Sequence, residues 1–374
     1  MPPLKVLHVA GSADWAGGEV YLLQLAERLD RARFSLSVVC PAAGPLAERL
    51  ERAGVHAPVI PMEDRLVDPR ALRALSRHFR RECPHIVQSH GARANFYGRL
   101  AARLARVPRH LSTVHNSLYD YPVPPLRRAL YLALDRVTVP WTETVVCVAE
   151  SLARDLIERS RVPAGKVRVI PNGVDLARFD PARADGGRIR RVFDLGPGPV
   201  LGIIGRMTPQ KDHHTFLAAL AVVKAAVPEV QALIVGDGPL RKSVEAEAVR
   251  LGLERACRFT GVRNDIPDCL AAASVVVLSS VSEGFPFTVL EALALARPLV
   301  ATAVDGVTEI VEPDVTGLLV PPRRPDLLAR AALGLLDDPE RARSLGQAGR
   351  KAVEARFSIE LMITRLERLY LEGH

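Results

Sequence analysis

"SVVVLSSVSEGFPFTVLEALALARPLVAT" (residues 274–302) combines two kinds of hydrophobic pattern. The apolar runs SVVVLSS (274–280) and PLVAT (298–302) are short, as in buried strands, whereas TVLEALALA (288–296) is long enough for a helix. A glycine and a proline mark the turn between the first strand and the helix. A strand, a helix and a strand in this order predict two parallel strands joined by a crossover helix.

The same order of elements repeats along the whole chain. Because 374 residues exceed what one hydrophobic core usually organises, we expect two domains. The segment DPARADGGRIRRVFDLGPGP (180–199) separates two series of strands and helices and has the composition of a linker. The sequence therefore predicts the α/β class, with two Rossmann-like doubly wound domains facing each other across a cleft. We place them at residues 1–190 and 191–356, followed by a C-terminal helix over 357–374.

The charge of the chain is unevenly distributed. The formal net charge is +8, and the basic excess lies within residues 1–190. Many of its arginines occur at helical spacing in segments 69–81 and 98–110. These segments are either solvated helix faces or a surface for anionic lipid or an acidic acceptor. No nucleic-acid-binding motif accompanies the charge, so we expect no nucleic acid partner.

The beginning of the sequence and its cysteines favour a cytoplasmic protein. MPPLKVLHVAGS runs directly into a strand-like segment instead of a signal peptide, and no apolar stretch is long enough to span a membrane. The five cysteines are odd in number, scattered and never spaced as CxxC, which argues against a disulfide framework and a zinc site. A peripheral position at the inner face of the membrane is the alternative that the basic first half leaves open.

The first strand ends in glycines that do not form a dinucleotide fingerprint. The glycines are Gly11, Gly17 and Gly18, and the second strand ends in Cys40 instead of an acidic residue. Both departures count against NAD binding. A glycine pair at a helix start is suited either to binding an anion or simply to capping the helix.

Two cations follow the first strand of the second domain. Arg206 and Lys211 lie in the turn GRMTPQKD, which contains a proline. The guanidinium can bind two phosphate oxygens and the ammonium adds a compact charge, so the pair could stabilise a diphosphate leaving group. The competing interpretation is a solvated basic turn.

Two carboxylates flank the turn in the opening stretch. Glu283 lies in the loop, whereas Glu291 falls about one turn into the following helix, so they do not share a helix face. They are best suited to accepting hydrogen bonds from sugar hydroxyls. The start of that helix near Thr288 would present free N–H groups to an anion, and Gly284 allows a close approach of backbone.

These motifs occur together with TVHN (113–116), VIPNGVDLARF (169–179), IVGDGPLR (234–241) and GLLVPP (317–322). In this order and spacing the set resembles family 4 glycosyltransferases, the retaining group with the two-domain B-type glycosyltransferase fold. The resemblance extends over nearly the whole chain and is densest from 166 to 320. It implies transfer of a hexose from a UDP- or GDP-sugar to a hydroxyl acceptor in glycan, lipopolysaccharide or glycolipid assembly. It also implies that the C-terminal helix crosses back to the first domain.

The resemblance carries roles to individual positions. Glu291 would bind the ribose hydroxyls, Glu283 the donor sugar, and Arg206 and Lys211 the diphosphate, while His115 would touch the sugar near its reacting carbon. The implied catalytic residues are His115, Arg206, Lys211 and Glu283. The implied donor-binding and nucleotide-binding residues are Gly17, Gly18, Gly205, Arg263, Gly284, Phe285, Phe287, Thr288, Val289 and Glu291. The implied acceptor contacts are His90 and Asn116.

No metal and no separate cofactor are expected beside the nucleotide-sugar co-substrate. The sequence contains no DxD motif, the usual aspartate pair for a nucleotide-bound divalent ion, and Arg206 and Lys211 can supply the positive charge instead. The resemblance implies attack on the face from which the diphosphate departs, with the phosphate taking the acceptor's proton. No side-chain nucleophile is then required.

Two other functions share these features. A non-hydrolysing nucleotide-sugar epimerase has the same two-domain fold, and a nucleotide-sugar-binding protein without turnover would need the same donor contacts. The expected partners are the nucleotide-sugar donor and a sugar, lipid-linked sugar or other hydroxyl acceptor. Contact of the basic first domain with an anionic membrane is a further expectation.

Overall fold

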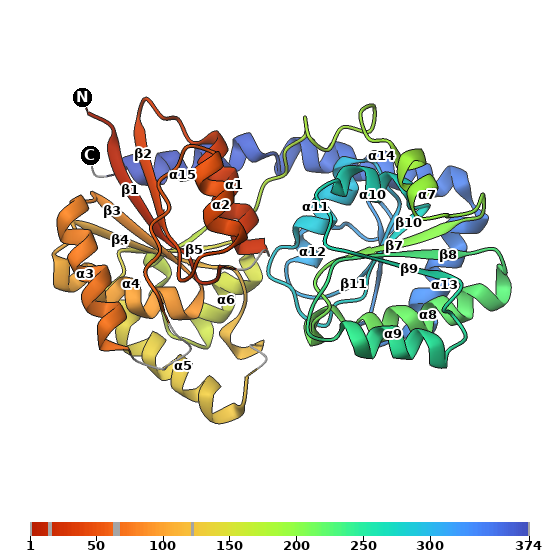
Figure 1. The fold of residues 1–374 in the computed structure, drawn as a ribbon, viewed down its shortest axis with the longest axis horizontal. Coiled ribbons are helices and arrows are strands. Elements are labelled where there is room, and N and C mark those ends of the chain that lie inside the picture. The colour runs from red at the N-terminus through yellow and green to blue at the C-terminus, as the bar shows by residue number, and fades with distance from the viewer. Residues whose placement is uncertain (1, 14–16, 63–67, 121–122, 373–374) are drawn as a thin grey trace. The chain divides into compact units, whose positions relative to one another are not determined.

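The computed structural model describes residues 2–13, 17–62, 68–120 and 123–372, and its chain forms two compact units (Figure 1). Unit 1 comprises Met1–Asn172 and Glu360–His374, and unit 2 comprises Gly173–Ile359. Each unit contains a six-stranded sheet whose neighbouring strands are parallel, with helices between consecutive strands. The predicted α/β class with two doubly wound domains is confirmed.

Unit 1 has the strand order β2-β1-β3-β4-β5-β6. Its strands are β1 (Leu4–Val9), β2 (Phe34–Val39), β3 (Ile86–His90), β4 (Arg109–Val114), β5 (Thr144–Cys147) and β6 (Val167–Val169). Its helices are α1 (Gly17–Arg28), α2 (Pro45–Arg52), α3 (Pro69–Glu82), α4 (Gly91–Ala105), α5 (Pro125–Thr138), α6 (Glu150–Glu158) and α15 (Ile359–Leu371).

Alternate residues of β1 belong to opposite faces of the unit 1 sheet. Leu7 and Val9 pack with residues of α3 and α4, whereas Ala10, the residue directly after β1, packs with residues of α1 and α2. This follows from the period of two along a strand, which places successive side chains on opposite faces. Both faces are therefore covered, as expected for a parallel sheet.

Unit 2 has the strand order β12-β11-β10-β7-β8-β9. Its strands are β7 (Val200–Ile204), β8 (Gln231–Val235), β9 (Cys257–Gly261), β10 (Val275–Leu278), β11 (Leu299–Thr302) and β12 (Leu318–Val320). Its helices are α7 (Gly186–Val192), α8 (His213–Ala226), α9 (Arg241–Arg250), α10 (Ile266–Ala272), α11 (Phe287–Ala294), α12 (Val307–Ile310), α13 (Pro325–Asp337) and α14 (Pro339–Arg356). The opening stretch of the sequence forms β10, α11 and β11.

The two units divide at Asn172 and Gly173, earlier than the expected position near residue 190. The expected linker is part of unit 2 because it packs there. Ile189 and Leu195 are buried, and a Cβ on Gly186 would collide with the backbone at Ala271. The segment is rich in Gly, Pro and charged residues, so its sequence does not indicate that a few of its side chains are buried against unit 2.

The C-terminal helix α15 belongs to unit 1. Its Tyr370 is fully buried, and Arg109 of β4 donates hydrogen bonds to the carbonyls of Tyr370 (2.8 Å) and Leu369 (3.1 Å). A positive charge at the end of a helix satisfies carbonyls that have no partner within the helix and matches the sign of the helix dipole. The helix that follows unit 2 in the sequence is thus fixed to unit 1 by a buried arginine.

We predict that Arg109→Gln loosens α15 while Arg33→Gln does not. A hydrogen bond from a charged donor contributes about 1.5–3 kcal/mol to stability, and Arg109 donates two such bonds to carbonyls of α15. Arg33 also pairs with α15, through Glu367 at 3.5 Å, but its side chain is 49% exposed, and such pairs contribute little. Hydrogen–deuterium exchange of the α15 peptide should accelerate only in Arg109→Gln. Equal protection in both variants would contradict this anchoring role.

Candidate active site

In unit 2 the turns that follow neighbouring strands are joined by backbone hydrogen bonds. The N–H of Met207, after β7, donates to the carbonyl of Asp237, after β8, at 2.9 Å. The N–H of Val281, after β10, donates to the carbonyl of Gln210 at 2.8 Å. Because the carboxyl ends of parallel strands meet at one edge of a sheet, these turns form one continuous surface.

Two glycines make this close assembly possible. A Cβ on Gly236 would collide with the carbonyl of Gly205, and a Cβ on Gly306 would collide with the carbonyl of Gly284. Gly236 also has a φ of 129°, which side-chain-bearing residues rarely adopt. The glycines thus allow the turns after β7 and β8, and those after β10 and β11, to touch through backbone.

Lys211 and Glu283 form an ion pair within this surface. Lys211 Nζ lies 2.6 Å from Glu283 Oε1, and the two side chains are 22% and 9% exposed. Ser280 Oγ donates to the same carboxylate oxygen at 2.5 Å, and Asp305 Oδ2 accepts from the Glu283 N–H at 3.0 Å. The carboxylate is therefore held in one orientation with a cation beside it.

Glu291 is half-buried and lies on α11. It is not part of the ion pair, but the charge of Lys211 affects the pKa of its carboxyl. Removal from water raises the pKa of the Glu291 carboxyl to about 7, although the charges of Arg178 and Lys211 act in the opposite direction. The carboxyl is therefore balanced between its neutral and charged forms near neutral pH.

The other predicted donor residues occupy different environments. Arg206 is exposed, and Gly205 lies beside the side chain of Lys211. Thr288 Oγ1 donates to the carbonyl of Ile204 at 3.3 Å, which ties the first turn of α11 to the end of β7. The remaining side chains are buried in unit 2, which leaves backbone as their means of contact with a ligand; they are Phe285, Phe287 and Val289.

The helix after the loop begins at Phe287, one residue before the expected start. The N–H of Val289 is bonded to the carbonyl of Pro286 at 3.2 Å. Of the predicted amide donors, Val289 is therefore already used within the turn.

Arg263, the residue predicted to cover the nucleotide base, is held by a carboxylate. Its guanidinium makes two hydrogen bonds with Asp265, at 2.8 and 2.6 Å, and lies 5.3 Å from the centre of the Phe193 ring. Arg188 binds the same carboxylate. The planar guanidinium is thus fixed in place, whereas its contact with a base stays a prediction.

In unit 1 the predicted histidines lie next to each other. His115 Nε2 is 3.1 Å from His90 Nδ1, and a Cβ on Gly18 would lie 3.8 Å from the His115 ring. Gly17 and Asn116 are exposed. His90 is only 3% exposed and uses its second ring nitrogen with His8, at 2.7 Å. Its ring is therefore internal, which does not fit the expected contact with an acceptor.

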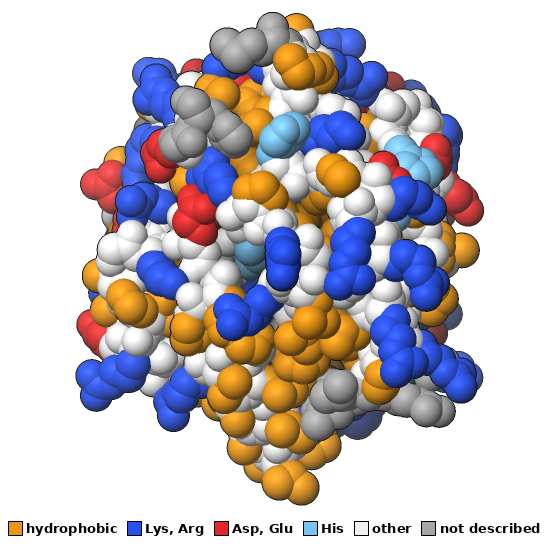
Figure 2. Space-filling model, turned by 90° about the vertical axis from the view of Figure 1, so that its left-hand side faces the viewer, with side chains coloured by type: hydrophobic (Ala, Val, Ile, Leu, Met, Phe, Trp, Pro, Cys, Tyr) orange, Lys and Arg blue, Asp and Glu red, His pale blue; other side chains and the backbone are white. Residues whose placement is uncertain are grey.

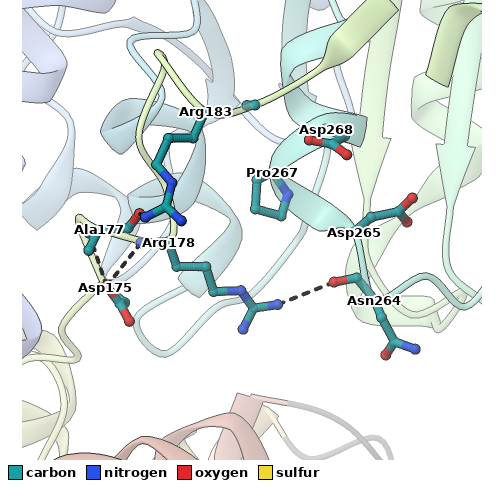
Figure 3. Close-up of a pocket in the computed structure, with 9 residues that line it drawn as sticks. Asp175, Ala177, Arg178, Arg183, Asn264, Asp265, Pro267 and Asp268 are labelled. Carbon is teal, nitrogen blue, oxygen red and sulfur yellow. Dashed lines mark hydrogen bonds between the residues drawn. The ribbon is translucent and has the colours of Figure 1, made fainter. Parts of the chain in front are cut away.

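A pocket of about 520 Å³ lies within unit 2, and one of its lining residues is Asp265, the carboxylate that holds Arg263 (Figure 3). Its walls come from the segment after Gly173, from the loop before α10 and from the first turn of α10. Arg178 Nη2 donates to the carbonyl of Asn264 at 3.3 Å. The lining residues are Asp175, Ala177, Arg178, Arg183, Ala184, Asn264, Asp265, Pro267 and Asp268. None of them was predicted as a site residue.

Four residues of the candidate site were missed from the sequence. Ser280 donates and Asp305 accepts a hydrogen bond that orients Glu283. Burial raises the pKa of the Glu291 carboxyl and the charge of Arg178 opposes this shift, and His8 contacts the ring of His90. Arg178 falls within the motif VIPNGVDLARF, so the motif itself could have indicated it. The other three are single polar residues at or near strand ends, where the sequence gives no signal of their partners.

The known proteins that this chain resembles are glycosyltransferases. The model of the family described as "Glycosyltransferase Family 4" matches residues 15–178. The model of the family described as "Glycosyl transferases group 1" matches residues 188–352. The chain is 28% identical to a UDP-Gal:alpha-D-GlcNAc-diphosphoundecaprenol alpha-1,3-galactosyltransferase of Escherichia coli, over 99% of the chain and 97% of that protein. It is 30% identical to a D-inositol 3-phosphate glycosyltransferase of Salinispora tropica, over 94% of the chain and 78% of that protein.

Solved structures show the same fold. The crystal structure of Anabaena HepE in complex with UDP-glucose has a TM-score of 0.87 and 23% identity, covering 98% of this chain and 99% of that one. The chain thus has the two-domain α/β fold of these solved structures. The chain belongs to glycosyltransferase family 4. It is an enzyme, and the comparisons do not support the epimerase alternative.

We predict that nucleotide-sugar affinity decreases as the pH falls through 7. Below this pH the Glu291 carboxyl is protonated in the free protein. If Glu291 binds the ribose hydroxyls, as the resemblance implies, it then loses its capacity as an anionic acceptor. Affinity should be about tenfold weaker at pH 6 than at pH 8. Calorimetric titration with a nucleotide sugar measures this, because its diphosphate does not titrate in that range.

The matched variant is Glu291→Gln, which keeps the shape and removes the titration. Its affinity should be weaker than that of the wild type at pH 8 and nearly independent of pH. An unchanged pH dependence in Glu291→Gln would show that another group is responsible.

Proposed function

We propose that this enzyme transfers a hexose from a UDP-sugar to a hydroxyl of a lipid-linked sugar in the assembly of a cell-envelope glycan. The full-length similarity to the galactosyltransferase of Escherichia coli supports a UDP-sugar over a GDP-sugar. A GDP-mannose-dependent relative of Mycobacterium tuberculosis matches only 71% of the chain. The observation that carries the proposal is the cluster of Lys211 and Glu283 at the strand ends of unit 2.

The proposed chemistry is a substitution at the anomeric carbon with retention. The bond from that carbon to the diphosphate oxygen breaks, the bond to the acceptor oxygen forms on the same face, and the departing phosphate takes the acceptor's proton. Arg206 and Lys211 would stabilise the charge that develops on the diphosphate, where preorganised cations are most effective. Glu283 would hold sugar hydroxyls and Glu291 the ribose.

We propose that this reaction proceeds without a metal ion. In other transferases a divalent cation held by a DxD motif neutralises the diphosphate, but this sequence contains no such motif. Arg206 is exposed to solvent, whereas Lys211 is part-buried and held by Glu283. Two such groups can provide the charge of the missing ion.

A panel of nucleotide sugars tests the donor assignment. A ligand that binds only the folded protein stabilises it by about 2.7 kcal/mol at a concentration 100 times its Kd. We expect UDP-galactose or UDP-glucose to raise the unfolding temperature more than GDP-mannose does, followed by transfer to a lipid-linked GlcNAc diphosphate. A larger shift with GDP-mannose would contradict the choice of UDP.

Lys211→Ala tests the leaving-group role. We expect kcat/KM for the donor to fall by about 100-fold or more, the usual effect of removing one preorganised charge. Lys211→Arg, which retains the charge, should recover part of the activity. Lys242→Ala removes an exposed lysine of α9 in the same unit and is the control. Equal rates in Lys211→Ala and Lys242→Ala would remove Lys211 from the mechanism.

We further propose that α5 brings unit 1 to an anionic membrane. No helix among the described residues is long and apolar enough to cross a bilayer. On α5, however, only Thr138 is buried, while Leu126 and Val137 are 83% and 64% exposed. Figure 2 shows apolar side chains gathered at the lower end of this face of unit 1, with Lys and Arg side chains around them. An apolar helix face flanked by arginines is typical of interfacial binding.

Sedimentation with vesicles of phosphatidylcholine and phosphatidylglycerol tests this contact. Burying one large apolar side chain contributes about 1.5–3 kcal/mol, so Leu126→Gln/Val137→Gln should weaken binding by at least about tenfold. The control is Val249→Gln/Val262→Gln, which changes two exposed valines of unit 2. Equal binding of the two double variants would contradict the role of α5.

A further inference from the structure

A buried chain of four rings runs through unit 1, from α15 to the end of β4. Tyr370 Oη lies 3.4 Å from His8 Nε2, His8 Nδ1 lies 2.7 Å from His90 Nε2, and His90 Nδ1 lies 3.1 Å from His115 Nε2. Tyr370, His8 and His90 are almost inaccessible, and His115 is half-buried. The chain therefore connects the protein interior with a residue of the candidate site.

The register of the sheet places the members on one face. His8 of β1 is paired with Gln88 of β3, and His90 of β3 is paired with Thr113 of β4. Paired residues of parallel strands, and residues two apart in one strand, point to the same side of a sheet. The arrangement is thus a consequence of strand pairing, and α15 supplies the remaining ring.

The three imidazoles are neutral near pH 7. Burial lowers the pKa of His8 to about 3 and that of His115 to about 4, and it lowers the pKa of His90 well below its ordinary value. A neutral imidazole has one nitrogen that donates and one that accepts. In a chain of such rings, the direction of one hydrogen bond therefore fixes the direction of all the others.

The direction is set at Tyr370. Gln88 Nε2 donates to Thr113 Oγ1 at 2.7 Å, so Gln88 Oε1 is left to accept from the Tyr370 hydroxyl, at 2.5 Å. A tyrosine has one proton to donate, and it goes to Gln88 Oε1 because an amide oxygen can only accept. The longer contact with His8 is then a bond from the His8 Nε2–H to the Tyr370 oxygen.

We propose that Tyr370 and Gln88 are positioning residues that set the tautomer of His115 through His8 and His90. His8 Nδ1 accepts from the His90 Nε2–H, and His90 Nδ1 accepts from the His115 Nε2–H. His115 Nδ1 consequently carries a lone pair instead of a proton. This inference rests on the proposed function in so far as His115 contacts the donor sugar.

The tautomer decides what His115 offers to a sugar. With Nδ1 unprotonated, the ring can accept a hydrogen bond from a sugar hydroxyl. If the hydrogen bonds between the rings ran in the opposite direction, His115 Nδ1 would carry a proton and donate. A sugar hydroxyl that must donate its proton to His115 would then have no acceptor there. The tautomer therefore affects donor binding without any change in the side chains that touch the sugar.

Nitrogen-15 NMR of the ligand-free protein with labelled histidine tests the proposal directly. Nitrogens with and without a proton resonate far apart, and variants His8→Gln, His90→Gln and His115→Gln assign the signals among the ten histidines. We expect a protonated Nε2 in all three rings. In Gln88→Met, which is similar in shape, the Tyr370 hydroxyl is released to donate to His8, and all three rings should carry the proton on Nδ1.

Tyr370→Phe is the second variant, and it should abolish the wild-type pattern because the His8 Nε2–H loses its acceptor. Tyr21→Phe is the matched control. Its ring lies 5.5 Å from the His90 ring and 5.2 Å from the His115 ring, but among the described residues its hydroxyl has no hydrogen-bond partner. The wild-type pattern should persist in Tyr21→Phe. A wild-type pattern in folded Gln88→Met and Tyr370→Phe would overturn the proposal.

Donor kinetics separate this inference from the proposed function. If His115 accepts from the sugar, Gln88→Met should raise the donor KM by about fivefold, the value of one lost hydrogen bond, with a smaller change in kcat. If Gln88→Met reverses the tautomers but leaves the donor KM unchanged, the proposed ring chain is supported and the contact between His115 and the sugar is contradicted. Unreversed tautomers would overturn the ring chain whatever the kinetics.

Discussion

The ion pair between Lys211 and Glu283 organises the candidate site. The two residues lie in turns after β7 and β10, strands that are neighbours in the sheet of unit 2 but distant in the sequence. Ser279 Oγ reinforces the junction by donating to the carbonyls of Lys211 and Asp212, at 2.9 Å each. A part-buried cation is stable there because a carboxylate compensates the lost hydration. The same side chain is thereby held in place for an anionic ligand.

In unit 1, hydrogen bonds between neutral histidine rings have the role that the ion pair has in unit 2. Buried imidazoles must satisfy their nitrogens, and here each ring satisfies the next. The chain ends in Tyr370 of α15, a helix that Arg109 fixes to the sheet. A residue near the end of the sequence can therefore influence a residue of the candidate site without approaching it.

The sequence was sufficient for the α/β architecture, because hydrophobic periods are local, whereas the roles of the individual site residues stay predictions. It could not indicate that Lys211 and Glu283 bind each other, since pairing depends on the order of strands in the sheet. His8 and Tyr370 were missed because one polar residue in an apolar strand or helix does not reveal its partners. The two units divide at Asn172 instead of near residue 190 because the expected linker packs on unit 2 through Ile189 and Leu195, and such contacts are also non-local.

The central claim is retention of configuration without a side-chain nucleophile, supported by fixed charges at the strand ends of unit 2. The most direct measurement is the anomeric configuration of the product by proton NMR, with a UDP-α-hexose as donor and a lipid-linked GlcNAc diphosphate as acceptor. The account predicts an α-linked product, recognised by the small coupling constant of its anomeric proton. A β-linked product would contradict it, because inversion requires attack from the face opposite the diphosphate and a base to activate the acceptor.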